Sequence, residues 1–271
     1  MPGFSVLISI YHKESPIYFR EALDSVFAQN LQPSEIVLVE DGPLTPELYT
    51  VIDEYRTKYP IFKIVKNEIN LGLGLALAKG VENCSYEYIA RMDTDDIIPP
   101  DRFEKQYKII EQGIDVVSCW SAIFINDINN IIATKYRPQN HNDIIKLAHR
   151  RSPVCHAAVF TRKSAILAAG NYLHRPYYED YHLWVRMMLN GAIFHNIQEP
   201  LYYVRTTDEQ VARRRGLSYL KTELSCMKEF FDIGFYSITD LCINSTIRIL
   251  VRLMPERFTA SIMRIIWNHK S

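Results

Sequence analysis

The sequence has no excess of charge of either sign, because Lys plus Arg and Asp plus Glu both number 31 among its 271 residues. A neutral chain has no general attraction for nucleic acid, so we expect no nucleic-acid partner. It has no apolar run of about 18 residues, the length that a transmembrane helix needs. The N-terminal apolar run has no basic leader and is too short for a signal sequence. We therefore expect a cytoplasmic protein whose only possible membrane contact is peripheral, on the inner face.

Metal-binding patterns built on cysteine and histidine are also missing. The odd number of cysteines, their wide spacing and the absence of any C-x-x-C pair favour reduced, buried thiols in a cytoplasmic protein. No histidine pair has zinc spacing, and no Ser/His/Asp order suggests a hydrolase triad. The five cysteines are Cys84, Cys119, Cys155, Cys226 and Cys242.

Apolar strands alternate with helical segments over the first 120 residues. This alternation predicts an α/β fold whose mostly parallel central sheet is flanked by helices on both faces. Thr45 and Pro46 form a typical helix start, with Thr45 as the cap. The predicted strands are 5–11, 35–42, 61–66, 86–92 and 115–119, and the predicted helices are 18–29, one from Thr45, 73–83 and 101–112.

The rest of the chain is more mixed and ends in a helical tail. Without a repeat or a low-complexity linker, we expect one catalytic domain over 1–208, with halves 1–120 and 121–208, and a helical C-terminal extension over 209–271. Short strands are predicted at 121–126, 131–134, 192–197 and 200–205, and helices at 140–150, 163–169 and from Glu179.

Acidic residues follow two of the predicted strands. Glu40-Asp41 ends one, and Asp93-Thr94-Asp95-Asp96 follows another, while Gly72 comes shortly after a third. Ligands of parallel α/β sheets bind at the carboxyl ends of strands, so these residues would share one site. Clustered carboxylates are stable when exposed, hydrogen-bonded or bound to a cation, and Mg²⁺ or Mn²⁺ takes them together with phosphate oxygens. The alternative is a solvated acidic loop that caps the helix near 101.

Three other features each have a functional and a structural interpretation. Asp41 could accept a hydrogen bond from a nucleobase or ribose, or could belong to an Asp-Gly-Pro turn. Glu179-Asp180, set among aromatic residues, could deprotonate an acceptor hydroxyl, or could simply favour the helix dipole. A lone histidine such as His156 is more often structural than a ligand.

Taken in order, these signals resemble glycosyltransferase family 2, which has the GT-A fold. The resemblance is closest to the branch of bacterial exopolysaccharide, capsule and lipopolysaccharide clusters, the amylovoran-type transferases. It extends from about residue 4 to 206. The matching segments are VLISIYH at 6–12, EIVLVEDG at 35–42, Asn70-Leu71-Gly72, YIARMDTDD at 88–96, Pro100, Arg102, Gln106, His156, Gly170, Glu179-Asp180, Leu183-Trp184-Val185-Arg186 and Tyr203-Val204-Arg205.

The resemblance implies an inverting, metal-dependent transfer from a nucleotide-diphosphate sugar, UDP-linked, to a glycan or lipid-linked acceptor. Residues 1–120 would bind the donor and 121–208 the acceptor. Asp180 would be the general base, and Mn²⁺ or Mg²⁺ would bind Asp95 and Asp93. The donor set is Glu40, Asp41, Asn70, Gly72, Arg91, Asp93 and Asp95, and the acceptor or positioning set is Asp96, His156, Glu179, Trp184 and Arg186.

The sequence departs from this family pattern at two places. An Arg-Asn pair common in relatives is replaced by Leu77 and Ala78, so a phosphate or base contact is either missing or supplied elsewhere, with Lys79 and Arg91 as the candidates. No histidine follows Arg205, so metal ligands beyond Asp95 are not specified.

The tail interleaves basic and apolar residues over 209–231 and 246–270. Such helices can lie on an anionic membrane, or can pack on the domain with their charges in water. Two other functions also fit the chain: a sugar-phosphate nucleotidyltransferase and a degenerate, non-catalytic glycan- or nucleotide-binding module. The loop YHKESP lacks the glycines of a nucleotidyltransferase phosphate loop, and the retained acids argue against a degenerate module.

Overall fold

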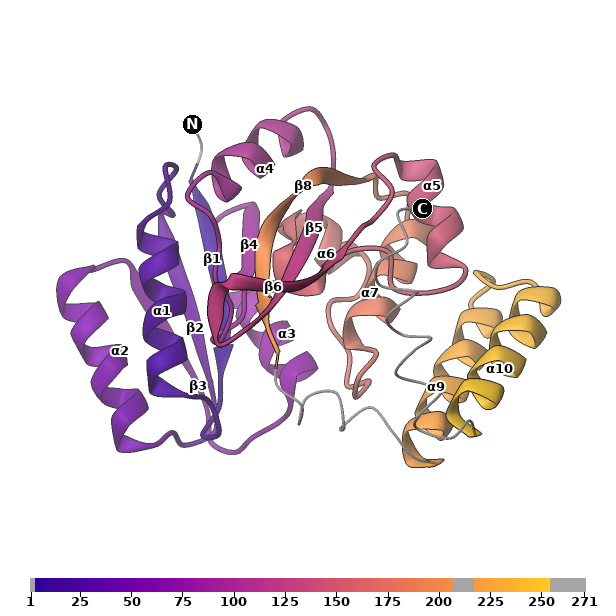
Figure 1. Cartoon of the computed structure of the whole chain (residues 1–271), viewed down its shortest axis with the longest axis horizontal. Coiled ribbons are helices and arrows are strands. Elements are labelled where there is room, and N and C mark those ends of the chain that lie inside the picture. Colours follow the sequence, from indigo (N-terminus) through magenta and orange to yellow (C-terminus); the bar gives the residue numbers. More distant parts are fainter. Residues whose placement is uncertain (1–2, 207–216, 254–271) are drawn as a thin grey trace.

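An eight-stranded sheet forms the centre of the computed structural model, which describes residues 3–206 and 217–253 (Figure 1). The strand order is β3-β2-β1-β4-β7-β5-β6, and β8 pairs with β5. The first four strands are parallel to one another, as predicted. These strands are β1 (Phe4–Ile10), β2 (Glu35–Asp41), β3 (Phe62–Asn67) and β4 (Tyr88–Met92).

Helices connect these parallel strands at the predicted places. Thr45 caps the second helix by accepting a hydrogen bond from the Leu48 amide, and Pro46 occupies its first turn. Gly72 precedes the third helix with φ of 85°, a left-handed backbone angle that favours glycine. The helices are α1 (Pro16–Phe27), α2 (Pro46–Lys58), α3 (Leu73–Asn83) and α4 (Arg102–Ile110).

The second half of the sheet is mixed, and here two predictions of strand number were wrong. The segments predicted at 115–119 and 121–126 form one strand, and so do those at 192–197 and 200–205. The pairing between these two long strands shifts register near Pro200, which has no amide hydrogen for the ladder. The strands are β5 (Val116–Ile125), β6 (Asp127–Lys135), β7 (Phe160–Arg162) and β8 (Phe194–Arg205).

Strand β7 lies antiparallel between β4 and β5, so the sheet continues without a gap from one half to the other. Strand β8 runs parallel to β5 and brings its carboxyl end to the segment after β4, where Ile97 and Tyr203 form an isolated bridge. The shorter helices of this half are α5 (His141–Ala148), the 3₁₀ turn η1 (His156–Ala158), α6 (Lys163–Ala168) and α7 (Glu179–Leu189).

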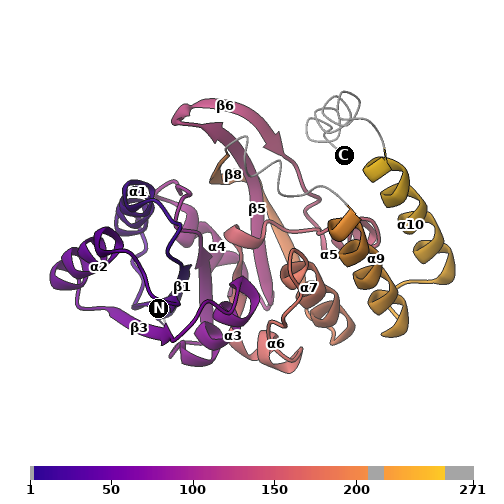
Figure 2. The ribbon, with the colours of Figure 1, turned by 90° about the horizontal axis from the view of Figure 1, so that it is seen from below.

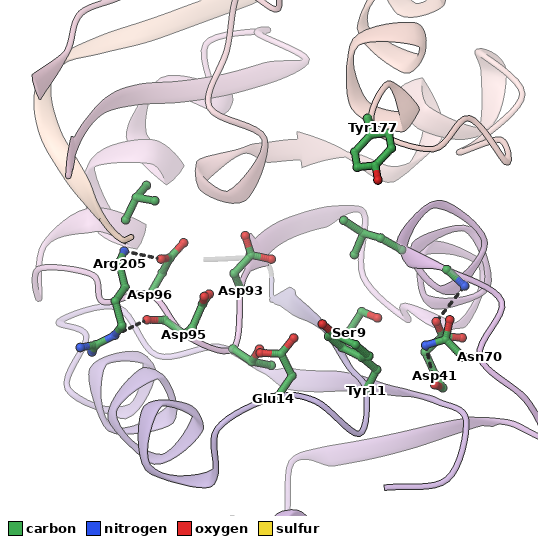
Figure 3. Close-up of a pocket in the computed structure, with 14 residues that line it drawn as sticks. Ser9, Tyr11, Glu14, Asp41, Asn70, Asp93, Asp95, Asp96, Tyr177 and Arg205 are labelled. Carbon is green, nitrogen blue, oxygen red and sulfur yellow. Dashed lines mark hydrogen bonds between the residues drawn. The ribbon is translucent and has the colours of Figure 1, made fainter. Parts of the chain in front are cut away.

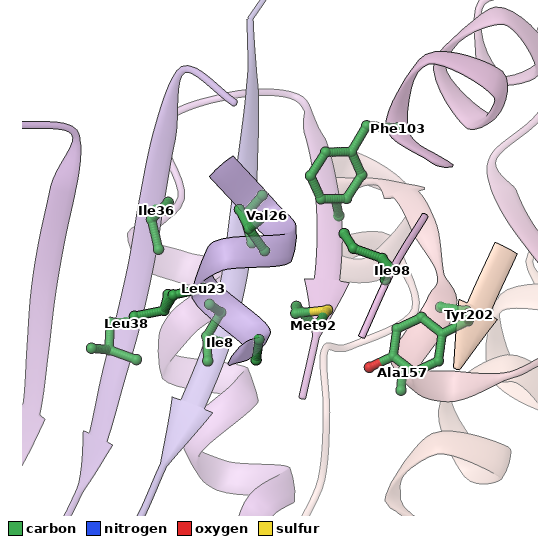
Figure 4. Close-up of a cluster of buried hydrophobic side chains, with 14 of the residues drawn as sticks. Ile8, Leu23, Val26, Ile36, Leu38, Met92, Ile98, Phe103, Ala157 and Tyr202 are labelled. Carbon is green, nitrogen blue, oxygen red and sulfur yellow. The ribbon is translucent and has the colours of Figure 1, made fainter. Parts of the chain in front are cut away.

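Alternating side chains of the strands bury two separate apolar layers. Val6, Ile8 and Ile10 pack against α1, α2 and α4 (Figure 4), whereas Leu7 packs on the other face with α3, α6 and α7. This two-sided burial explains why the first strands are apolar almost throughout. It also leaves the strand ends as the place where polar side chains can reach solvent.

The C-terminal extension is a helical hairpin made of α9 (Leu217–Asp232) and α10 (Ile238–Leu253). Its inner face joins Tyr181 and Val185 of α7 in a third apolar cluster that includes Phe230 and Tyr236. Figure 2 shows α9 between α7 and α10. In the described part of the chain the extension is thus helical as predicted; the basic segments in 207–216 and 254–271 lie outside the described residues.

Two predictions of absence can be compared with the described residues. No helix among them has the length and apolarity required to cross a bilayer. All five cysteines are free thiols; four are buried and Cys242 is exposed.

Candidate functional site

The carboxyl ends of β1, β2, β4 and β8 surround one cleft of about 530 Å³ (Figure 3). It contains six of the predicted site residues, contributed by segments that are far apart in the sequence. The residues that line the cleft are Ser9, Tyr11, Glu14, Asp41, Asn70, Gly72, Leu73, Asp93, Thr94, Asp95, Asp96, Tyr177, Val204 and Arg205.

Asp41 organises the wall of the cleft at the start of α3. Its carboxylate accepts hydrogen bonds from the Leu71 and Gly72 amides, each at 2.9 Å, and from the Asn67 side-chain amide, also at 2.9 Å. The Asn70 side chain donates to the Asp41 carbonyl at 3.2 Å. Asp41 therefore fixes the loop that begins α3 and still presents an edge of its carboxylate to the cleft.

The loop after β4 brings Asp93, Asp95 and Asp96 into the cleft. Two arginines with little exposed area, Arg91 and Arg205, contact this loop. Arg91 is 3% exposed, and its Nη2 lies 2.6 Å from Oδ1 of Asp93. The Arg205 amide donates to Oδ1 of Asp96 at 2.8 Å, and its Nε donates to the Asp95 carbonyl at 2.9 Å. The backbone of this loop is therefore tied to the end of β8.

The negative charges of Asp93 and Asp95 make it less favourable for Asp96 to ionise. Asp96 is 3% exposed. Burial raises its pKa well above the usual value, and the neighbouring charges of Asp95 and Asp93 raise it further. A cation would relieve this repulsion. Within 3–206 and 217–253, however, no group of three or more His, Cys, Asp or Glu side chains is arranged to hold a metal by protein ligands alone.

Several residues that line the cleft were not predicted from the sequence. Tyr11 and Glu14 follow β1, and the Thr94 hydroxyl donates to Glu14 at 2.8 Å. Because β1 is the central parallel strand, the rule that placed the acids at strand ends could have found these residues as well. No local signal pointed to Tyr177, which reaches the cleft only through the tertiary fold.

Tyr177 faces the strand-end wall from the segment that begins α7. Figure 3 shows its ring across the cleft from Tyr11 and Asp41. The same segment approaches α3, since a Cβ placed on Gly74 would lie 3.1 Å from Cβ of Glu179. The start of α7 therefore closes the side of the cleft that is opposite the sheet edge.

Asp180 lies in the first turn of α7, three residues after Tyr177, and does not line the cleft itself. Its Oδ2 accepts a hydrogen bond from the Ser152 hydroxyl at 3.2 Å. Burial raises the pKa of Tyr172, which Arg91 partly lowers; the charges of Asp180 and Asp93 both raise it further. Asp180 therefore lies outside the cleft lining, and its charge and that of Asp93 both act on the Tyr172 hydroxyl.

Glu40 and Arg91, predicted to bind the donor, lie behind the cleft wall. Neither side chain lines the cleft, and Glu40 lies 3.2 Å from the Lys66 ammonium. Strand alternation explains this placement, because adjacent residues of β2 point to opposite faces and Asp41 takes the cleft side. Arg91 contacts Asp93 from below, so in this structure it supports the acidic loop.

Three residues predicted for the acceptor side do not line the cleft, and their side chains contact other parts of the domain. Trp184 is fully buried and cannot stack on an acceptor sugar; its ring lies 6.0 Å from that of His156. His156 pairs with the Tyr172 hydroxyl at 3.1 Å, and burial, then Arg91, lowers its pKa well below the usual value. Arg186 donates to the carbonyls of Ala169 and Asn171. The contacts of His156 and Arg186 therefore fix residues 169–172, which precede α7.

The departures from the family pattern also have a structural counterpart. Leu77 of α3 is buried in the apolar cluster on this face of the sheet, and Ala78 packs against the same cluster. Lys79, which we considered as a substitute phosphate contact, donates to the Lys66 carbonyl at 2.6 Å and to Oδ1 of Asn67 at 2.9 Å. Lys79 therefore stabilises the end of β3 next to Asp41.

Comparison with known proteins gives consistent matches over nearly the whole chain. The family model described as glycosyl transferase family 2 matches residues 5–167, and that of glycosyl transferase family group 2 matches 88–263. The amylovoran biosynthesis glycosyltransferase AmsE of Erwinia amylovora is 38% identical over 98% of both chains. The UDP-Gal:alpha-D-GlcNAc-diphosphoundecaprenol beta-1,3-galactosyltransferase of Escherichia coli is 36% identical over 97% of this chain and 96% of that protein.

Solved structures show the same fold at low sequence identity. S. aureus TarS 1–349 in complex with UDP-GlcNAc superposes with a TM-score of 0.63 at 17% identity, covering 97% of this chain and 71% of that one. The mannosyltransferase of Pyrobaculum calidifontis in complex with GDP-Man and Mn²⁺ gives 0.58 at 15% identity, over 98% and 85%. The fold is thus the GT-A type that the sequence predicted. With a family model over more than half its length and relatives aligned almost end to end, the chain belongs to glycosyl transferase family 2 and is a glycosyltransferase.

Proposed function

We propose that this glycosyltransferase transfers a hexose or N-acetylhexosamine from a UDP-sugar to a lipid-linked acceptor, with inversion, during bacterial surface polysaccharide synthesis. The observation that carries the proposal is the single cleft in which Asp41 and the acids after β4 meet, facing the start of α7. Relatives at 36–38% identity, one of which is named for a UDP-Gal donor and a diphosphoundecaprenol-linked acceptor, support the choice of substrates.

The donor would bind the half of the chain formed by residues 1–120. Asp41 and Asn70 offer an acceptor and a donor of hydrogen bonds to a base or ribose, at the start of α3. Asp93 and Asp95, on the loop after β4, face the position expected for the diphosphate. The half formed by 121–208, including the start of α7, would receive the acceptor. A nucleotidyltransferase is less well supported, because Glu14 occupies the loop after β1 where such enzymes use a glycine-rich, basic segment.

The loop after β4 would hold a Mn²⁺ or Mg²⁺ ion through Asp95 and Asp93. Its carboxylates fit a hard divalent cation. Burial first, and then the charges of Asp95 and Asp93, raise the pKa of Asp96, and such an ion would offset the second of these causes. A bound metal would neutralise charge on the leaving diphosphate. Because no group of three protein ligands is arranged among the described residues, we expect donor oxygens to complete the coordination.

Asp180 would remove the proton from the incoming hydroxyl group of the acceptor. It stands in the first turn of α7, where the Ser152 hydroxyl donates to its Oδ2 at 3.2 Å. Attack from this side, opposite the diphosphate, would invert the anomeric centre. The oxocarbenium-like transition state would resemble that of glycoside hydrolysis.

We expect the protein to contact the cytoplasmic side of a membrane surface. A lipid-linked acceptor would lie there, and the outer face of the α9–α10 hairpin would contact the lipid. Ile243, Ile247 and Leu250 of α10 are 46%, 48% and 59% exposed. An exposed apolar face on a helix is typical of peripheral contact with a membrane surface, whereas Arg248 and Arg252 of the same helix point toward Glu223.

The proposal is tested by donor binding followed by transfer. Thermal stability would be measured with UDP alone, Mn²⁺ alone and both together, and we expect a large shift only with both. Asp95→Ala should abolish the combined shift. Asp180→Asn should keep it and lower transfer from UDP-galactose to a synthetic GlcNAc-diphospho-lipid by about 10²–10⁴-fold. Full transfer by Asp180→Asn would refute the base assignment, and metal-independent transfer by the wild type would refute the metal site.

A further inference from the structure

Two side chains of the segment before α7, one on each side of Tyr177, form hydrogen bonds with α9. On one side, Nε of Arg175 donates to Oε2 of Glu229 at 2.8 Å. On the other, the Tyr178 hydroxyl donates to Oε1 of Glu223 at 2.7 Å. Glu223 and Glu229 lie nearly two helical turns apart on α9, so the two contacts hold a short piece of backbone at fixed points.

Between these contacts, Tyr177 has a backbone conformation that tyrosine rarely adopts. Its φ is 70°, in the left-handed region. Such a conformation is strained for a residue other than glycine, and persists only where surrounding contacts impose it. The side chain remains 54% exposed, lines the cleft and has its ring 5.1 Å from that of Tyr219 on α9. The clamp therefore presents an aromatic ring to the cleft.

The second helix of the hairpin anchors the clamp. Glu223 is 1% exposed and accepts hydrogen bonds from Arg252 of α10, at 2.8 Å from Nε and 3.2 Å from Nη2. Nε of Arg248 lies 3.7 Å away, and the Arg252 guanidinium lies 4.6 Å from the centre of the Tyr219 ring. A connected set of contacts thus runs from α10 through α9 to the cleft.

Glu229 connects the clamp to α7 as well. The oxygen that accepts from Arg175 also lies 3.1 Å from Nε2 of His182. Nε of Arg186 donates to the other ring nitrogen of His182 at 3.0 Å. Burial, then the charge of Arg186, lowers the pKa of His182 to about 4, so at neutral pH its ring donates to Glu229 as a neutral group. Both ends of the turn that leads into Asp180 are thereby fixed to α9.

Docking of the hairpin does not by itself require the buried Glu223–Arg252 pair or the partly exposed Arg175–Glu229 pair. Phe230, Phe235 and Tyr236 already bury an apolar face against Tyr181 and Val185 of α7. Buried ion pairs add little net stability over apolar packing, and are better explained where they fix one arrangement among several. The arrangement fixed here is the conformation of the segment that carries Tyr177 and leads into Asp180.

We propose that the α9–α10 hairpin is a positioning element of the transfer reaction: through Glu223 and Glu229 it clamps the Arg175–Tyr178 turn, and so holds Tyr177 in the cleft as the aromatic surface against which the acceptor sugar packs. This inference rests on the proposed function and adds two positioning residues and one acceptor-contacting residue to it. An aromatic ring beside a proposed base would orient a sugar hydroxyl toward that base, and misplacement of such a surface lowers transfer steeply.

The test compares transfer with donor hydrolysis in the full-length protein. UDP-galactose with Mn²⁺ serves as donor, and the synthetic GlcNAc-diphospho-lipid as acceptor; UDP release without acceptor reports hydrolysis by water. For the double variant Glu223→Gln/Glu229→Gln, we expect kcat/KM for the acceptor to fall by roughly 10- to 100-fold while hydrolysis keeps its rate. Tyr177→Gly should show the same pattern and Tyr177→Phe should transfer normally, because the ring is retained.

Two variants separate positioning from general damage. Asp232→Asn removes the exposed pair that Asp232 makes with Lys228 on the same helix, and should leave transfer unchanged. Tyr177→Gly should fold even if the double variant does not, because glycine adopts positive φ without strain. Equal losses of transfer and hydrolysis, or normal transfer in both Tyr177→Gly and the double variant, would overturn the inference. A wild-type protein that neither transfers nor releases UDP would instead overturn the proposed function.

Discussion

Replacing Arg205 with methionine should loosen the acidic loop of the cleft and destabilise the whole domain. Arg205 is 3% exposed. It donates to the carbonyls of Asp95 at 2.9 Å and Asn126 at 3.1 Å, and pairs with the Glu21 carboxylate. Its guanidinium also lies 4.1 Å from the centre of the Tyr18 ring. Methionine keeps the apolar stem but removes every one of these donors.

The size of the effect follows from the contacts that are lost. Hydrogen bonds that involve a charged group contribute about 1.5–3 kcal/mol each, and breaking a buried charged pair costs about 3–5 kcal/mol. Glu21 is half exposed and can regain water, so we expect Arg205→Met to lower the free energy of unfolding by about 3–4 kcal/mol. At about 2–4 °C per kcal/mol for a domain of this size, the melting temperature should fall by roughly 10 °C.

Urea denaturation and thermal melting would measure this loss, with Arg20→Met as the matched control. Arg20 pairs with Glu54, but both side chains are more than 40% exposed, and such pairs contribute at most about 1 kcal/mol. The Arg205 variant should also show a smaller shift with UDP and Mn²⁺, because the Asp95 carbonyl loses its anchor. Equal stability of the two variants would refute the view that Arg205 holds the cleft.

Three further outcomes are expected. Asp41→Asn should lose the stability shift given by UDP and Mn²⁺ and should melt earlier, because an amide cannot accept from all the donors now bonded to that carboxylate; an unchanged shift in scanning fluorimetry would contradict this. The pKa of His182 is lowered from 6.5 to about 4, so its folded form favours the neutral ring and the stability it supports is lost as the pH falls from 6.5 toward 4. His182→Gln should flatten that part of the curve of unfolding free energy against pH, and a curve parallel to the wild type would exclude His182 as the cause. Leu250→Glu should weaken sedimentation with phosphatidylglycerol vesicles; equal binding of both proteins to phosphatidylglycerol and phosphatidylcholine vesicles would argue against a lipid contact through α10.

The order of strands and helices in the first half could be predicted because each element carries its own local signal. Helix α3 was predicted over its observed residues, and the cap at Thr45 is present. The second half could not be predicted as well. Strand β7 has three residues and no periodicity of its own, and only its pairing with β4 and β5 makes it the link between the halves. The register shift at Pro200 made one strand look like two.

The sequence predicted which residues lie in one cleft where their position depends on strand ends, but not where it depends on depth in the domain. Asp41 and Asp95 line the cleft because parallel strands end at one edge. Asp180 and Trp184 lie four residues apart on the same face of α7. Asp180 is in the first turn of the helix, whereas Trp184, one turn later, is buried in the core. A sequence pattern gives the face of a helix but not the depth at which each turn lies.

The charges around the cleft explain why a donor and a cation should bind together. Asp93, Asp95 and Asp96 lie on one short loop, which the guanidinium groups of Arg91 and Arg205 contact; of these, Arg205 is shared with Glu21. The arginines hold the loop in place, and burial, followed by the charges of Asp95 and Asp93, raises the pKa of Asp96. A diphosphate is itself anionic, so it would be repelled by this loop unless a divalent cation lay between them. The same repulsion that makes the acidic loop costly in the unliganded protein would therefore couple metal binding to donor binding.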